Sequence, residues 1–73
     1  MKKYTVDYKS GESRMSPGAS VDYMLVIVDG VELYAEAIVQ DNESANYDEL
    51  KASIIEQAGK HGIDANSLIF WHD

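Results

Sequence analysis

The fold is decided by residues 21–40, VDYMLVIVDGVELYAEAIVQ, in which two runs of β-forming residues flank Asp29-Gly30. A tight type I′ turn needs positive φ at both central positions, and Asp-Gly is one of the dipeptides that accept it. If the turn has two residues, Val28 faces Val31 and the register of both strands follows. The stretch therefore predicts an antiparallel hairpin with strands at about 21–28 and 31–40.

The two faces of this hairpin differ in composition. One face is almost wholly apolar, and its two alanines leave room for a closely packed helix; it comprises Asp22, Met24, Val26, Val28, Val31, Leu33, Ala35 and Ala37. The other mixes aliphatic, tyrosine and acidic residues, namely Val21, Tyr23, Leu25, Ile27, Glu32, Tyr34, Glu36 and Ile38. Because side chains alternate along a strand, we expect the first face to be the core and the second to point away from it.

A helix is predicted at about residues 47–61. Asn46 and Glu49 have the spacing of a capping box at its start, and Gly62 can adopt the left-handed conformation that often ends a helix. Apolar residues recur at helical spacing, at Tyr47, Leu50, Ile54 and Ala58.

Strands are also predicted near both ends of the chain, at about 2–9 and 67–72. In the last one, Leu68 and Phe70 share one face and are expected under the helix, whereas Trp71 lies on the opposite face. Residues 10–20 are rich in Gly, Ser and Pro and are expected to be a flexible connection.

The expected fold is a single α+β domain over 1–73, with the order β-β-β-α-β. One helix packs on one face of a mainly antiparallel four-stranded sheet. The last strand should run in the same direction as the third, and its place beside the first or the third strand is left open.

The charge of the chain is strongly acidic. Thirteen acidic and six basic residues give a net charge of −7, and no Lys or Arg occurs from Met15 to Leu50. A protein that binds phosphate backbones needs basic residues, so no direct binding to nucleic acid is expected. The alternatives are an ordinary solubilising surface and a protein partner with a basic surface. An acidic surface would include Asp41, Glu43, Asp48 and Glu49.

The sequence predicts a cytoplasmic protein. It contains no cysteine, which fits a reducing compartment. The first residues, MKKYTVDYKSGE, have no apolar stretch after the lysines and do not resemble a secretory signal. The longest apolar run, residues 23–28, is far shorter than a bilayer-spanning helix, so no membrane association is expected.

One helix covers one face of the sheet, so the opposite face is the candidate partner-binding surface. Its members are Tyr23, Leu25, Ile27, Glu32, Tyr34, Glu36 and Ile38, with Trp71 at its border. A contiguous apolar patch is unusual on a monomer and often marks an interface. The alternative is that residues 10–20, with Met15, fold over this face as a lid.

No catalytic, cofactor or metal site is predicted, and we expect no enzyme. His61 is explained by its place at a helix end, and His72 and Asp73 are adjacent residues that point to opposite sides of a strand. Residues 41–52 lack the oxygen ligand at the fifth position, the glycine at the sixth and the glutamate at the twelfth that a calcium-binding loop needs; Ala45, Asn46 and Ala52 stand there.

Three functional hypotheses follow from these observations. The first is a small protein-binding regulator or inhibitor, of a kind encoded by phages or mobile elements. Its most specific version is nucleic-acid mimicry, in which acidic side chains take the place of phosphates. The second is a structural homodimer closed through the open sheet face. The third is a metal-dependent or enzyme-subunit role that uses His72 and Asp73.

Overall fold

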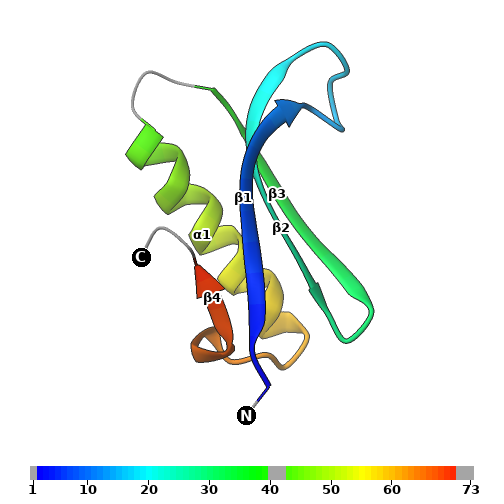
Figure 1. Cartoon of the computed structure of the whole chain (residues 1–73), viewed down its shortest axis with the longest axis vertical. Helices are drawn as coiled ribbons and strands as arrows, with labels where there is room; N and C mark the ends of the chain where they lie inside the picture. The colour runs from blue at the N-terminus through cyan, green and yellow to red at the C-terminus, as the bar shows by residue number, and fades with distance from the viewer. Residues whose placement is uncertain (1, 40–42, 71–73) are drawn as a thin grey trace.

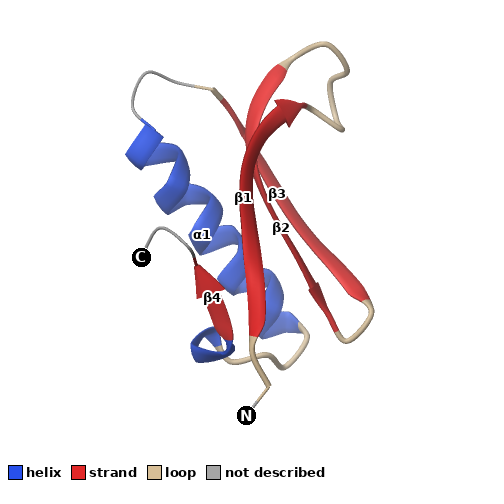
Figure 2. Ribbon diagram, in the orientation of Figure 1, coloured by secondary structure: helices blue, strands red, loops and turns tan. Residues whose placement is uncertain are grey.

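The computed structural model describes residues 2–39 and 43–70, and it shows the α+β fold expected from the sequence (Figure 1). The elements in chain order are β1 (Tyr4–Glu12), β2 (Ser20–Val28), β3 (Val31–Ile38), α1 (Glu43–Lys60), a short 3-10 helix η1 (Ala65–Ser67) and β4 (Leu68–Phe70). The strands form one sheet in the order β3-β2-β1-β4. Figure 2 shows α1 lying along one face of this sheet.

The hairpin between β2 and β3 has the predicted register. Val28 pairs with Val31, and Asp29 and Gly30 have φ values of 48° and 84°, so both turn residues are in the left-handed region that a type I′ turn requires. The Tyr4 hydroxyl donates a hydrogen bond of 2.9 Å to Asp29 Oδ1 and ties the turn to β1.

The core lies between α1 and the predicted face of the sheet. Its buried residues are Val6, Met24, Val26, Val28, Leu33, Leu50, Ile54, Ala58 and Leu68. Ala35 and Ala37 pack against this cluster, as expected where a helix approaches a sheet closely. Strand alternation and helical periodicity are confirmed for these residues. Two predictions of the hairpin faces are wrong: Val31, beside the turn, is 41% exposed, and Val21, on the opposite face, is buried.

β4 lies beside β1 and parallel to it, with Tyr4 opposite Leu68 and Val6 opposite Phe70. Since β1 and β3 are both antiparallel to β2, β4 runs in the same direction as β3, as predicted. Leu68 is buried and Phe70 packs against the core, whereas Ile69 is 41% exposed on the other face. Trp71 lies outside the described residues.

The prediction that Asn46 caps the helix is wrong. α1 begins at Glu43, so Asn46 lies inside its first turn and Glu49 lies further along, and the predicted capping box does not form. Asn46 is completely buried, and its Nδ2 donates to Asp22 Oδ2 at 3.0 Å and to the Ile38 carbonyl at 2.8 Å. Asp22 is also buried on the core-facing side of β2, and Ser10 Oγ donates to its Oδ1 at 2.6 Å. A buried carboxylate needs donors, and this requirement outweighs the local capping preference of Asn.

The end of α1 follows the prediction. Gly62 has φ 76°, its N–H donates to the Gly59 carbonyl at 3.1 Å, and the Ile63 N–H donates to the Ala58 carbonyl at 2.9 Å. These two bonds form a Schellman motif, and Ile63 packs against the core as the accompanying apolar residue.

The connection between β1 and β2 is shorter than the predicted 10–20, because β1 extends to Glu12 and β2 begins at Ser20. The Ser13 N–H donates to the Ala19 carbonyl at 2.9 Å and closes residues 13–19 into a loop. Gly18 has φ 95°, a conformation that glycine adopts without strain. We call residues 13–19 the β1–β2 loop.

Candidate functional site

The face of the sheet opposite α1 brings together all of the described residues predicted to bind a partner. In the register of β2 and β3, Tyr23 pairs with Glu36, Leu25 with Tyr34, and Ile27 with Glu32, while Ile38 pairs with Val21. We call this surface the open face. Trp71, predicted at its border, lies outside the described residues.

A pair of tyrosines occupies the middle of the open face. The ring centroids of Tyr23 and Tyr34 are 5.6 Å apart at an interplanar angle of 31°. Tyr23 also lies across Gly11 of β1, where an added Cβ would meet Tyr23 Cε2 at 3.4 Å. β2 and β3 therefore contribute a cross-strand aromatic pair, and the Tyr23 ring extends over Gly11 of β1.

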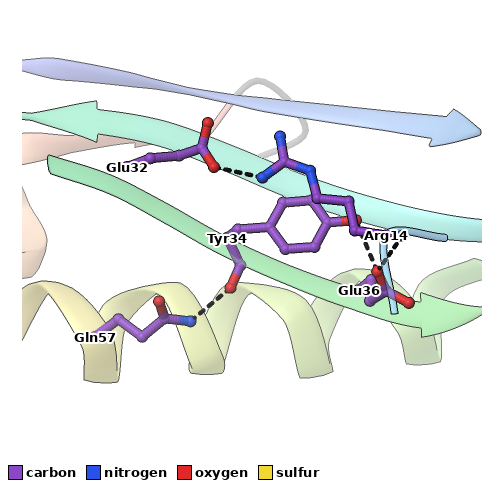
Figure 3. A network of polar contacts seen from close by, with 5 residues as sticks. All are labelled: Arg14, Glu32, Tyr34, Glu36 and Gln57. Carbon is purple, nitrogen blue, oxygen red and sulfur yellow. Dashed lines mark hydrogen bonds and ion pairs between the residues drawn. The ribbon is translucent and has the colours of Figure 1, made fainter. Parts of the chain in front are cut away.

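Arg14 of the β1–β2 loop lies on this aromatic surface (Figure 3). Its guanidinium carbon is 4.2 Å from the centroid of the Tyr34 ring, within the range of a cation–π contact. The same guanidinium forms an ion pair with Glu32, which raises the pKa of Arg14 and lowers that of Glu32. Both side chains stay accessible, at 52% exposure for Arg14 and 41% for Glu32.

Glu36 anchors the backbone of the same loop. Its carboxylate accepts hydrogen bonds from Ser13 Oγ, from the Tyr34 hydroxyl at 2.8 Å and from the Arg14 N–H at 3.1 Å. The hydrogen bond from Ser13 Oγ, followed by the one from the Tyr34 hydroxyl, holds the pKa of Glu36 below its usual 4.5. Burial and the bond to Glu36 raise the pKa of Tyr34.

The β1–β2 loop covers the open face only in part, and it does so with a residue that the sequence did not single out. Met15, the expected lid residue, is 81% exposed, whereas Arg14 makes the contact. Ile27 and Ile38 stay 55% and 71% exposed at the two ends of the β2–β3 pair. The sequence offered one signal for Arg14: it is the last basic residue before Met15–Leu50, an acidic stretch without Lys or Arg.

The free edge of β3 is partly closed by amide side chains from α1. In a two-residue hairpin the pair beside the turn is hydrogen-bonded and the pairs then alternate, so the Tyr34 and Ile38 carbonyls point away from β2. Gln57 Nε2 donates to the Tyr34 carbonyl at 2.9 Å (Figure 3). Asn46 Nδ2 likewise donates to the Ile38 carbonyl. An added strand would therefore meet an edge on which the Tyr34 and Ile38 carbonyls already accept hydrogen bonds.

Of the predicted acidic surface, Asp48 and Glu49 have described side chains, and both lie on α1. Asp48 and Glu49 are exposed on α1, on the opposite side of the sheet from Glu32 and Glu36. Glu43 is the first residue of α1 and its side chain is not described, while Asp41 lies outside the described residues.

Within residues 2–39 and 43–70, no cluster of three or more His, Cys, Asp or Glu has the arrangement of a metal site. His61 is exposed just after the end of α1. His72 and Asp73, the pair considered for metal chemistry, lie outside the described residues.

No protein-family model, curated protein or solved structure matches the chain. In the part of the chain that the structure describes, no helix combines the length and the apolar character needed to cross a membrane.

Proposed function

We propose that this chain is a non-enzymatic protein-binding module that docks onto a larger protein through its open face. The observation that carries the proposal is the exposure of Ile27 and Ile38 beside the Tyr23–Tyr34 pair, on a face that α1 leaves uncovered. Exposed aliphatic and aromatic side chains with acidic neighbours have the composition of a protein interface. As a regulator or inhibitor, the module would act by occupying a surface that its partner needs.

The partner should carry a basic surface, because the chain has a net charge of −7 and opposite charges steer association. The geometry favours apolar docking over mimicry of a phosphate backbone. Glu32 and Glu36 are already engaged by Arg14, Ser13 and Tyr34, and the exposed Asp48 and Glu49 lie on the other side of the sheet.

A capture experiment tests the docking surface. Tagged wild-type protein is compared with the double variant Ile27→Ser/Ile38→Ser and with Glu56→Ser, a matched control whose side chain is 73% exposed on α1. We expect proteins retained by the wild type and by the control but released by the double variant. If all three chains retain the same proteins, the open face is not the docking surface.

A homodimer closed through the open face is the second candidate, since the same exposed isoleucines favour it. Analytical ultracentrifugation at micromolar concentration distinguishes the homodimer from the monomeric protein-binding module. A concentration-dependent dimer that Ile27→Ser/Ile38→Ser dissociates favours the homodimer, and a clean monomer eliminates it.

A further inference from the structure

We propose that the Tyr34 ring and the Glu32 carboxylate form a subsite for an arginine side chain of the partner, and that Arg14 occupies this subsite in the free protein. The inference rests on the proposed docking function and names the chemistry of the partner. We call the pair Tyr34 and Glu32 the guanidinium site.

The contacts of Arg14 define what the guanidinium site selects. The cation lies 4.2 Å from the Tyr34 ring centroid and pairs with Glu32 from the next residue position on the same face of β3. A planar guanidinium can stack on a ring while its N–H groups reach a carboxylate beside it, whereas a lysine ammonium is a compact point charge. The site therefore favours arginine over lysine.

Arg14 can leave the site without unfolding the loop. Its backbone N–H and the neighbouring Ser13 hydroxyl are held by Glu36, and the loop is closed by the bond from the Ser13 N–H to the Ala19 carbonyl. Only the side chain of Arg14 contacts Tyr34 and Glu32, and it is half exposed. Exposed ion pairs contribute little net stability, so exchange for a second guanidinium costs little.

The surroundings of the site fit an arginine that projects from an apolar partner surface. Ile27 pairs with Glu32 and Leu25 with Tyr34 on the open face. An arginine seated on Tyr34 would place aliphatic neighbours from the partner against Ile27, which is 55% exposed. With a net charge of −7, the chain attracts such a partner over distance as well.

The test is an NMR titration of the full-length ¹⁵N-labelled protein with acetyl-Gly-Arg-Gly-amide, and with acetyl-Gly-Lys-Gly-amide as the matched probe. The wild type is compared with two variants. Arg14→Ser empties the guanidinium site, and Arg14→Lys replaces the planar guanidinium with an ammonium but keeps the net charge. If Arg14 fills the site about nine-tenths of the time, its removal should tighten the apparent Kd for the arginine peptide about tenfold.

We expect this gain in Arg14→Ser and a smaller gain in Arg14→Lys, because a lysine still pairs with Glu32 but binds the site more weakly. The shifts should be centred on Glu32 and Tyr34, the lysine peptide should bind more weakly, and Arg14→Ser/Glu32→Gln should lose the gain. Equal affinity for wild type and both variants, or shifts centred on Asp48 and Glu49 of α1, overturns the guanidinium site. Such a failure leaves the docking function standing, because capture through Ile27 and Ile38 is measured separately. Loss of face-dependent capture overturns the docking function itself.

Discussion

At the residue scale, the contact between Asp22 and Asn46 ties the first turn of α1 to the sheet. Both side chains are buried, and the Asn46 amide joins the Asp22 carboxylate to the last residue of β3 through the Ile38 carbonyl. Among residues 2–39 and 43–70, the buried Asn46 Oδ1 has no hydrogen-bond partner. The contact is retained because a buried carboxylate without donors costs far more.

Removal of the Asn46 amide should destabilise the fold. Asn46→Ala leaves Asp22 Oδ2 and the Ile38 carbonyl without a donor, and we expect a loss of about 1–3 kcal/mol in the free energy of unfolding. Urea denaturation measures it, with the exposed Asn66→Ala as control. Combined with Asp22→Ala in a double-mutant cycle, the two changes should be strongly non-additive. Simple additivity would show that the two side chains do not stabilise each other.

The anchoring of the β1–β2 loop by Glu36 should depend on pH. The folded-state pKa of Glu36 lies below 4.5, so its contribution to stability is present above the unfolded-state pKa. That contribution is lost as the pH falls below about 4.5 and through the folded-state value. Carboxyl ¹³C shifts measure the titration directly, and Glu36→Gln should remove this part of the pH dependence of urea unfolding. A Glu36 pKa at or above 4.5 contradicts the anchoring.

At the element scale, the hairpin and the apolar stripe of the helix were predictable because their signals are local. Asp29-Gly30 sets the register of two strands, and Leu50, Ile54 and Ala58 recur within one segment. The start of α1 was not predictable, since Asn46 is held by Asp22, which lies 24 residues away in the chain. The place of β4 beside β1 likewise depends on packing between distant segments.

Two glycines near the end of α1 should respond oppositely to the same substitution. Gly62 has φ 76°, so Gly62→Ala should destabilise the fold by about 1–2 kcal/mol. Gly59 is exposed within α1, and an added Cβ there meets nothing within 4 Å. Gly59→Ala should therefore stabilise the fold by about 0.5–1 kcal/mol. Thermal unfolding compares the two variants, and a Gly62→Ala variant as stable as the wild type would contradict the Schellman ending of α1.

At the scale of the whole molecule, helix α1 leaves one face of the sheet uncovered (Figure 2). The sequence predicted which residues lie there, because strand alternation separates them from the core. It did not predict that Arg14 lies over Tyr34, since Arg14 is 18 residues from Glu32 and 22 from Glu36. The β3 edge is partly closed by Gln57 and Asn46, so recognition should use the face of the sheet rather than added strands.

Hydroxyl-radical footprinting of the protein, free and bound to a captured partner, tests the open face most directly. We predict that binding lowers the reactivity of Tyr23, Ile27, Tyr34 and Ile38, while the exposed side chains of α1 keep theirs. Protection of α1 with unchanged reactivity at Ile27 and Ile38 would contradict docking through the open face.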